Sequence, residues 1–474
     1  MNVLVMKFGG SILRRREDYE RVADIVVEEL GRNHLPLCVV SAMKGVTDSL
    51  IKAVNTVQYN IDFKPSVFVE GLRKEHIKAL PSNEEDPQPL TSELDKLEHI
   101  LSYIQSSKEL SDSAYAYAVS RGESFSSQVL SRHLEKKGVS NRAFGGEDLL
   151  VTNENSREAD INLDKTKRHA TAILKPLIAE RVVPIVAGFA GRSASGKVTI
   201  MGRGGSDDTA VCLAYCMDVD RVIKYVDEDG IMNIDPKFIE NVKTNSSTVS
   251  EKFGGLSPPQ VISYLSYVEA SELLREERTK IVHFKVLTPL MKGNILLHIK
   301  NIYKSDGMGT VIGPENEFNH ARQHGRPKAI SYQRNLYGIR FLPTQSLTHT
   351  EVYAKVFDAL AREQVDVRYL STSGYQISLL MPKSDVERAL RALKKLDIAM
   401  DVAPIDGKKG TFSIIGSGMR GVHGFFSRVT GVFAEHSINI EQATQPNSEN
   451  IIRFSVDDED IPLAVSALYA RFFG

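Results

Sequence analysis

Short apolar runs alternate with segments of helical spacing along the first two-thirds of the chain. Runs typical of buried strands stand at 2–8 (NVLVMKF), 35–43 (LPLCVVSAM), 182–191 (VVPIVAGFAG), 197–202 (KVTIMG) and 221–227 (RVIKYVD). Residues 17–32 have helical spacing with a stop at Gly31, and 61–137 are predicted mostly helical around a polar break at 81–89. Another long helix is predicted to begin near Asp207. Strands alternating with helices predict an α/β sandwich with a largely parallel sheet.

Polar, glycine-rich segments follow the predicted strands. They occupy 7–10, 41–47, 188–191, 202–207 and 227–230. Ligands of parallel α/β sheets bind at the carboxyl ends of the strands. We therefore expect the functional site where these segments meet.

The last third of the chain contains an internal repeat of about 70 residues. In each copy a helix leads into a strand, at 354–371 and again at 427–444, and a strand and a second helix follow, at 375–395 and 451–473. We predict a catalytic domain at 1–312, a linker at 313–330 and β-α-β-β-α modules at 331–405 and 406–474. Such modules behind an enzyme-sized domain indicate a sensor attached to a catalyst. A purely dimerising role is the alternative, and the two roles are compatible.

The composition argues against several classes of protein. The chain has 474 residues, 42% of them hydrophobic and 25% charged, and its formal net charge of −1 gives no general attraction to nucleic acid or anionic lipid. No apolar run could span a bilayer, and the N-terminus lacks the layout of a signal peptide. The three cysteines, Cys38, Cys212 and Cys216, indicate a reducing cytoplasm. Cys212 and Cys216 share a helix face, and we expect them in the core rather than at a metal.

The segment GSGMRG at 416–421 matches the glycine spacing of dinucleotide-binding loops. Too few residues follow it to build the six-stranded sheet that holds a dinucleotide. We expect no NAD(P) site there. The glycines are predicted to let a ligand or a facing subunit approach the backbone closely.

Two other glycine-rich segments bear candidate chemistry. In KFGGS, at 7–11, Lys7 ends a strand and two glycines bare their backbone amides, which suits a phosphate chain lying over the loop. No P-loop motif is present in the sequence. In GRGGSDDTA, at 202–210, a helix start combines Arg203 with Asp207 and Asp208. Aspartate there would repel a phosphate, so this segment requires a ligand with charges of both signs.

Six motifs occur in an order that resembles one known family. They are VMKFGGS (5–11), VVSAMKGVTDSL (39–50), RGESFSSQVLS (121–131), GFAGRSASGKVTIMGRGGSDDTA (188–210), VDEDGIMNIDP (226–236) and LSYVEASELL (265–274). Together they resemble the aspartate kinases of the amino-acid kinase family, and the repeats resemble paired ACT modules. The resemblance implies a three-layer α/β/α sandwich followed by two ferredoxin-like modules. It also implies transfer of phosphate from ATP to the side-chain carboxylate of L-aspartate, the first step toward lysine, threonine and methionine.

The resemblance implies an amino-acid pocket. Arg203 offers a bidentate fork to the α-carboxylate, and Asp207 and Glu123 offer carboxylates to the α-ammonium. The remaining implied pocket residues are Ser41, Thr47, Phe189 and Ser206. A local salt bridge between Arg203 and Asp207 is the alternative. Asp208 is expected to be a helix cap or a solvated residue.

The resemblance also implies a nucleotide site. Lys7 is expected to act on the transferring phosphoryl group, with Asp207 as its catalytic companion. The implied ATP-binding residues are Lys7, Gly9, Gly10, Ser11, Asp227, Lys237 and Lys280. Mg²⁺ is expected to bridge the phosphates with few protein ligands. An exposed surface lysine is the alternative for Lys280.

Four residues on the nucleotide side depart from the family pattern, namely Tyr225, Val226, Lys237 and Phe284. They predict altered ATP affinity or weak activity. A non-catalytic amino-acid sensor and another kinase of the same fold, such as an N-acetylglutamate kinase, therefore stay open as alternatives.

The modules imply regulation and assembly. Met419, His423, Asn439 and Ile440 are expected to line an effector site. Lysine or threonine is the expected effector, and a homodimer or homotetramer is expected to form through these modules.

Overall fold

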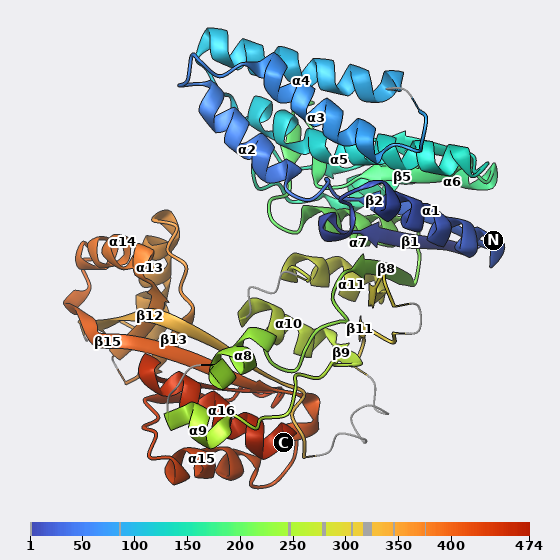
Figure 1. Ribbon diagram of the computed structural model, residues 1–474. Coiled ribbons are helices and arrows are strands. Elements are labelled where there is room, and N and C mark those ends of the chain that lie inside the picture. The colour runs from blue at the N-terminus through green and yellow to red at the C-terminus, as the bar shows by residue number, and fades with distance from the viewer. Residues whose placement is uncertain are drawn as a thin grey trace. The chain divides into compact units, whose positions relative to one another are not determined.

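The computed structural model describes residues 2–84, 87–244, 248–276, 281–304, 307–315, 325–344, 347–374 and 376–474 (Figure 1). They form two compact units. The first unit contains Met1–Ile231, Val261–Tyr267 and Thr279–Glu315, and the second contains Met232–Gln260, Val268–Arg278 and Asn316–Gly474. Among the described residues, no helix combines the length and apolar character needed to cross a membrane.

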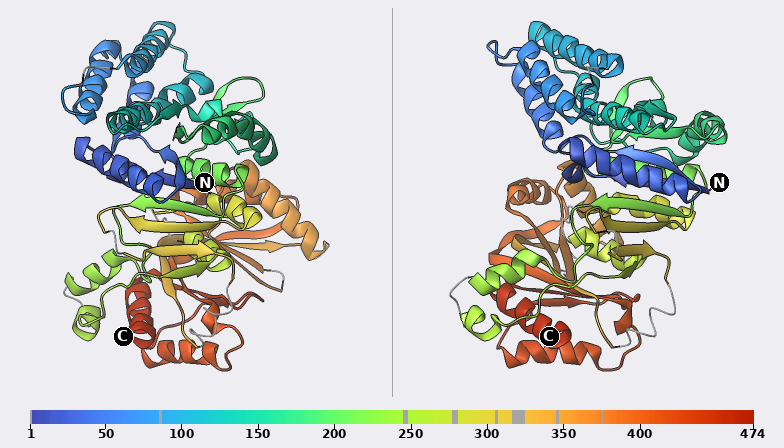
Figure 2. Two further views of the ribbon diagram at one scale, coloured as in Figure 1. Left: turned by 90° about the vertical axis from the view of Figure 1, so that its right-hand side faces the viewer. Right: turned by 45° about the vertical axis from the view of Figure 1, so that its right-hand side comes forward.

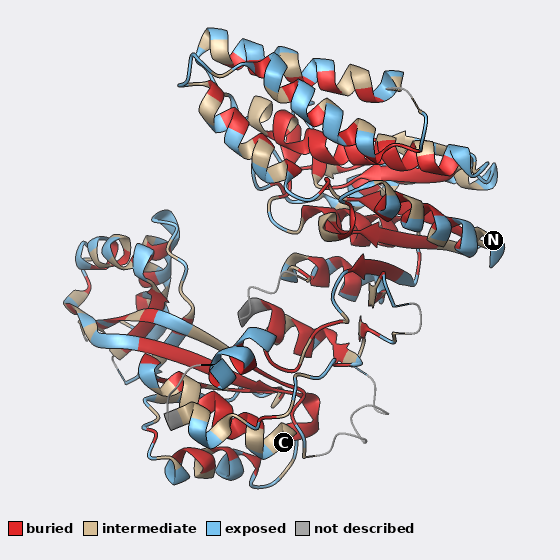
Figure 3. Cartoon of the chain, viewed as in Figure 1, coloured by how far each residue is buried: buried red, intermediate tan, exposed pale blue. Residues whose placement is uncertain are grey.

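An eight-stranded sheet organises the first unit. Its order is β3 (Asn141–Phe144), β5 (Val183–Ala187), β2 (His34–Val40), β1 (Asn2–Phe8), β8 (Arg221–Val226), β10 (Leu296–Asn301), β11 (Thr310–Gly313) and β9 (Tyr264–Ser266). All neighbours are parallel except β10 and β11, which confirms the predicted mainly parallel sheet. The central strands are buried almost throughout, as expected for strands covered on both faces (Figure 3).

Helices cover this sheet and extend beyond it. They are α1 (Arg16–Gly31), α2 (Val46–Val57), α3 (Pro65–Ala79), α4 (Gln88–Ser107), α5 (Asp112–Lys136), α6 (Leu163–Ala179), α7 (Gly205–Cys216) and α11 (Leu287–Gly293). In α1, Tyr19, Val22 and Val26 lie on the buried face at helical spacing, and the helix ends at Gly31 as predicted. Helices α2 and α4 pack on α5, and α3 packs on α4 (Figure 2). Cys212 and Cys216 are buried in α7, which confirms their predicted place in the core.

The predicted strands at 182–191 and 197–202 differ from expectation. The first run breaks into β5 and β6 (Ala190–Ser193), and β6 pairs with β7 (Val198–Ile200) and β4 (Val151–Thr152) in a separate three-stranded sheet. The break falls at Phe189, whose φ of 74° is rare for a residue with a side chain. This local turn diverts the chain out of the main sheet.

A six-stranded antiparallel sheet organises the second unit. Its order is β13 (Tyr369–Ser373), β14 (Gln376–Pro382), β12 (Ala329–Pro343), β15 (Ala399–Ile415), β17 (Ile451–Asp457) and β16 (Gln442–Thr444). With α13 (His349–Arg362), α14 (Lys383–Lys394), α15 (Phe425–Glu435) and α16 (Ile461–Phe473), it confirms the two predicted β-α-β-β-α modules. β12 and β15 run through the predicted boundaries at 330/331 and 405/406. The domain boundaries therefore stay a prediction.

The second unit also contains helices that precede the repeats in sequence. They are α8 (Pro236–Thr244), α9 (Thr248–Phe253) and most of α10 (Tyr267–Glu276). The Tyr469 hydroxyl of α16 donates to Asn233 over 3.4 Å, and the Phe238 ring lies 5.0 Å from that of Tyr332. Residues of α8 and α9 share one core with α15 and α16 of the second module.

Gly416 of GSGMRG is approached closely by another segment of the chain itself. A Cβ at Gly416, whose φ is 156°, would lie 2.7 Å from the backbone nitrogen of Lys328. The expectation that a ligand or a facing subunit makes this approach is therefore wrong at Gly416, where the segment before β12 makes it.

Candidate active site

Two lysines lie side by side near the carboxyl ends of the two central strands. Lys7 of β1 pairs in register with Lys224 of β8. Partners on neighbouring parallel strands project from the same face of a sheet, so both side chains leave it on one side. Both residues are buried, with 6% and 4% of their surfaces exposed. The two ammonium groups therefore meet in one enclosed place.

Asp207 bridges these lysines from the first turn of α7. Its Oδ1 lies 2.8 Å from Lys7 Nζ, and its Oδ2 lies 2.5 Å from Lys224 Nζ. Lys224 also donates to the carbonyl oxygen of Ile281. Burial opposes ionisation of Asp207, but the two lysines outweigh it and lower the pKa of this carboxyl group. Asp207 is thus an ionised link between two cations.

The structure brings Lys7 and Asp207 together and adds Lys224, which sequence reasoning missed. The available signal was a lysine inside the apolar run RVIKYVD. Burial lowers the pKa of Lys224 to about 8, while Asp207 works against that shift. A strand lysine in such surroundings is typical of a functional site.

The glycine loop passes directly over Lys7. A Cβ at Gly9 would lie 3.6 Å from Lys7 Nζ, and one at Gly10 would lie 2.7 Å from the carbonyl oxygen of Ala42. Ser11 donates to Asp227 at the end of β8 over 2.6 Å. Gly9 thus lies against Lys7, and the next residues of the loop connect it to Asp227; their nucleotide-binding roles stay predictions.

The close approach at Gly10 predicts a stability effect. Gly10→Ala is expected to destabilise the protein by about 1–3 kcal/mol, because backbone must move to admit the methyl group. Gly71→Ala, in the open interior of α3, is the matched control and is expected to stabilise by about 0.5–1 kcal/mol. Urea unfolding measures both changes. Equal effects of the two substitutions would contradict the close packing at Gly10.

Glu123 lies in α5 and is buried. Its carboxylate accepts the backbone N–H of Ala42, yet burial raises its pKa to about 8. One oxygen, Oε2, has no hydrogen-bond partner in the part of the chain that the structure describes. A buried acceptor without a partner is costly, and a donor from a ligand would satisfy it.

Arg203 is exposed in the loop before α7. Within the described ranges it forms no ion pair, because Asp207 binds the two lysines instead. The alternative of a local Arg203–Asp207 salt bridge is therefore wrong. The guanidinium is available to an anionic ligand.

The other predicted pocket residues lie at the same edge of the first unit. Ser41 follows β2 and donates its backbone N–H to Phe8, and Thr47 lies in the first turn of α2. Phe189, whose φ is positive, donates its backbone N–H to Thr209 Oγ1 over 3.1 Å. Ser206 is buried against Gly188, where a Cβ would lie 2.7 Å from that of Ser206.

Asp208 is buried, so its expected role as a cap or solvated residue is wrong. Burial and the neighbouring Asp207 raise its pKa to about 8. A carboxyl group whose folded-state pKa is raised makes the protein less stable as pH rises from about 4 to 8. In that pH range the carboxyl group ionises in the unfolded chain but stays protonated in the folded protein.

Asp208→Asn removes this pH dependence. Relative to the unsubstituted protein, the variant is expected to gain roughly 2–4 kcal/mol between pH 5 and pH 8. Asp358→Asn, at an exposed pair with Arg362, is the control and should show no such gain. Urea unfolding at both pH values measures the difference. A stability difference independent of pH would contradict the raised pKa.

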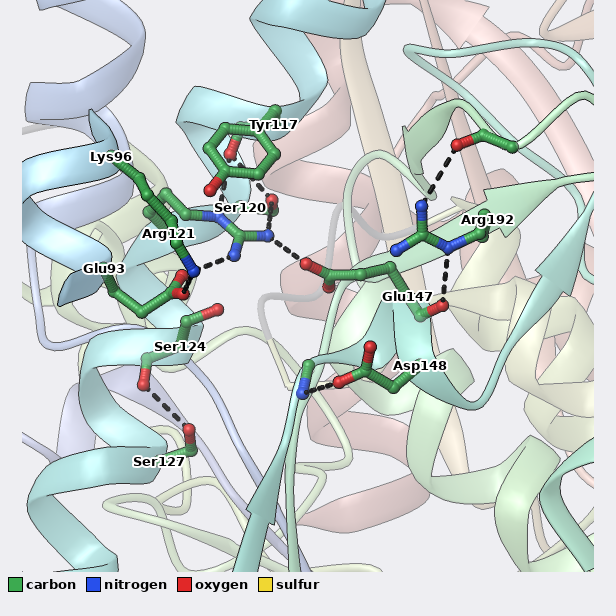
Figure 4. A network of polar contacts seen from close by, with 12 residues as sticks. Glu93, Lys96, Tyr117, Ser120, Arg121, Ser124, Ser127, Glu147, Asp148 and Arg192 are labelled. Atoms are coloured by element: carbon green, nitrogen blue, oxygen red, sulfur yellow. Dashed lines mark hydrogen bonds and ion pairs between the residues drawn. The ribbon is translucent and has the colours of Figure 1, made fainter. Parts of the chain in front are cut away.

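A network of polar contacts centred on Arg121 holds α5 in place (Figure 4). Arg121 pairs with Glu93 of α4 at 2.8 Å and with Glu147, and its guanidinium lies 4.2 Å from the centre of the Tyr117 ring. In Figure 4, Arg192 also reaches the backbone oxygen of Glu147, at 3.3 Å. These contacts anchor the turn of α5 that carries Glu123.

The other predicted residues lie in the second unit or outside the described residues. Lys237 is exposed in α8 of the second unit, and Lys280 lies outside the described residues. In the second unit, Met419 is buried in the core, Ile440 is half-buried, and His423 and Asn439 are exposed. The roles of these six residues stay predictions.

Comparison with known proteins identifies the family of the chain. The amino acid kinase family matches residues 2–301, and an ACT domain matches 345–396 and 412–472. The chain belongs to the amino acid kinase family, which confirms the predicted fold class.

Similar proteins cover nearly the whole chain. Aspartokinase 1, chloroplastic, of Arabidopsis thaliana is 26% identical over 99% of this chain and 80% of its own. The aspartate kinase of Pseudomonas fluorescens is 26% identical over 100% of this chain and 98% of its own. The solved structure of E. coli aspartokinase III with aspartate and ADP aligns over 100% of both chains, with a TM-score of 0.79 and 23% identity. That last likeness establishes the fold.

Proposed function

We propose that this protein is an aspartate kinase that converts ATP and L-aspartate to ADP and 4-phospho-L-aspartate. A side-chain carboxylate oxygen attacks the γ-phosphorus, and the bond from that phosphorus to the ADP oxygen breaks. The observation that carries the proposal is the buried Lys7–Asp207–Lys224 cluster beneath a glycine loop. The aspartokinases that align with nearly the whole chain support it.

Charge neutralisation is the main catalytic requirement. A carboxylate and a γ-phosphoryl oxygen about 4 Å apart repel by about 4 kcal/mol at an effective dielectric near 20. Lys7 supplies a buried positive charge at the loop, where it offsets this repulsion in the transition state. An aspartate carboxylate is already a nucleophile, so no general base is needed. Asp207 acts by holding Lys7 in place.

The amino-acid substrate requires groups for both of its charged ends. The exposed guanidinium of Arg203 suits the α-carboxylate. Both oxygens of Asp207 are engaged by lysines, so we assign the α-ammonium to Glu123, whose Oε2 lacks a partner among the described residues. An ammonium beside Glu123 would favour its ionised form and lower its pKa.

Mg²⁺ accompanies the nucleotide in this proposal. Asp227 and Ser11 present oxygen atoms beside the glycine loop, and such hard donors suit this ion. When bound, Mg²⁺ supplies positive charge to the nucleotide phosphates. The backbone amide of Gly10 orients the same phosphates, since the N–H of Gly9 donates to the carbonyl oxygen of Tyr225.

The modules of the second unit suit amino-acid regulation. We propose lysine or threonine as effector and a homodimer or homotetramer as the assembly. Another structure of E. coli aspartokinase III is in complex with lysine and aspartate, at a TM-score of 0.73 and 23% identity. His423 and Asn439 are the predicted effector residues with exposed surface.

ADP release tests the proposal against its two alternatives. L-aspartate, L-glutamate and N-acetyl-L-glutamate are each supplied with Mg-ATP. Turnover with L-aspartate alone is expected, and N-acetyl-L-glutamate is disfavoured because its acetylated amine carries no positive charge to pair with Glu123. Turnover with N-acetyl-L-glutamate would favour that other kinase. No turnover, with amino-acid binding retained, would favour the sensor.

A further inference from the structure

We propose that Lys224 is a second catalytic lysine, which contacts the transferring phosphoryl group together with Lys7. This inference rests on the proposed phosphoryl transfer. Asp207 is then a positioning residue that holds both ammonium groups at one place. Lys224 thus acts in phosphoryl transfer as well as forming part of β8.

The hydrogen-bond capacity of Lys224 supports direct contact with a ligand. An ammonium group has three donors. Two of them are directed at Asp207 and at the carbonyl oxygen of Ile281. The third has no partner among the described residues and is available to an anionic ligand beside Lys7, whose ammonium pairs with the other oxygen of the same carboxylate.

The charge balance distinguishes this cluster from the other buried lysines in the described residues. Lys328 pairs with the carboxylate of Glu269, and Lys409 pairs with two carboxylates, those of Glu441 and Asp457. At the active site, in contrast, two buried lysines share the one carboxylate of Asp207. An excess positive charge in a buried place is unfavourable unless an anion binds there. The structure thus contains a site prepared for an anion.

Alternative explanations for a buried lysine are weaker here. A lysine that only stabilised the fold would need one carboxylate, and Asp207 already has Lys7. An apolar residue would fit the strand, whose neighbours Val222, Ile223 and Tyr225 are buried. The second cation is therefore best explained by the charge of the reacting groups.

The titration of Lys224 gives the proposal a distinctive readout. The charged groups that act on it are Asp207, Lys7, Glu228 and Asp208. Its pKa is lowered to about 8, so in the free enzyme it loses its charge as pH rises through that value. kcat/KM is then expected to fall above about pH 8. Bound phosphates favour the charged lysine, so the corresponding fall in kcat should lie at higher pH.

The test compares Lys224→Met and Lys224→Arg with Lys409→Met, which changes a buried paired lysine of the second unit. Thermal unfolding first establishes that each full-length variant is folded. Lys224→Met is expected to lower kcat by about 100-fold or more, with a smaller change in the KM for L-aspartate. Lys224→Arg is expected to retain much of the activity and to lose the fall near pH 8. Lys409→Met should match the unsubstituted protein when no effector is present.

The pH profile separates Lys224, whose pKa is lowered to about 8, from Asp208, whose pKa is raised to about 8. Asp208→Asn should keep the alkaline fall that both Lys224 variants lose. A Lys224→Met variant with kcat within about threefold of the unsubstituted protein would overturn the inference. So would equal losses in Lys224→Met and Lys409→Met. If Lys224→Met does not fold, an unchanged alkaline fall in Lys224→Arg would overturn it.

Failure of the proposed function can be distinguished from failure of the inference about Lys224. If the unsubstituted protein releases no ADP with any amino acid, the proposed function fails. Titration calorimetry with Mg-ATP at pH 7 then measures ATP affinity, which tests the contact of Lys224 with the phosphates without requiring turnover. Weaker ATP binding in Lys224→Met than in Lys409→Met would support the contact, and equal binding would overturn it.

Discussion

Lys7→Ala is expected to lower the rate of ADP release by about a thousandfold or more while the fold persists. The substitution removes the positive charge that lies against the glycine loop. Losing a single preorganised donor to a developing charge costs about 10²–10³ in kcat, and losing a cation from phosphoryl transfer costs about 10³–10⁵. Asp207 keeps Lys224 as its partner, so no buried charge is left unpaired.

Steady-state ADP release with L-aspartate measures this loss, and thermal unfolding verifies the fold. Lys167→Ala is the control, because Lys167 is partly exposed and pairs with Asp218 in the same unit. Its activity should equal that of the unsubstituted protein. A Lys7→Ala variant that kept more than about a tenth of kcat would contradict the assigned role of Lys7.

Asp207→Asn is expected to destabilise the protein by about 3–5 kcal/mol at pH 7, the usual cost of removing one partner from a buried ion pair. It leaves two buried ammonium groups without a counter-charge. The loss should shrink as pH rises toward 10. A lysine whose pKa is lowered in the folded state binds fewer protons than in the unfolded chain, so stability rises with pH across that interval.

Urea unfolding at pH 7 and pH 9.5 measures the effect. The double variant with Asp207→Asn and Lys224→Met carries only one buried ammonium, so it should regain more than half of the lost stability. Asp358→Asn is the surface control and should change stability by less than about 0.5 kcal/mol. No recovery in the double variant would contradict the shared-carboxylate arrangement.

The sequence predicted most of the fold because its signals were local. Apolar runs gave β1, β2 and β8, and helical spacing with a glycine stop gave α1. The repeat of helix and strand predicted both modules. The membership of segments at 232–260 in the second unit was not predicted, because it depends on contacts such as that of Tyr469 with Asn233, far apart in sequence.

The candidate site was predicted in its parts but not in its connections. Lys7 and Asp207 were identified from motifs, and the structure joins them directly. Lys224 was missed because its importance depends on the register between β1 and β8, which no sequence pattern specifies. The bridging position of Asp207 was missed for the same reason. The sequence predicted that Asp207 binds the substrate ammonium, whereas in the structure both of its oxygens are paired with lysines.

Trapping of the acyl phosphate tests the central claim most directly. The full-length protein is incubated with Mg-ATP, L-aspartate and hydroxylamine, and both ADP and the aspartyl hydroxamate are quantified. The account predicts hydroxamate equal in amount to ADP, with both lost in Lys7→Ala. ADP without hydroxamate, or neither product from the folded protein, would contradict the assignment of this site to phosphorylation of the L-aspartate side chain.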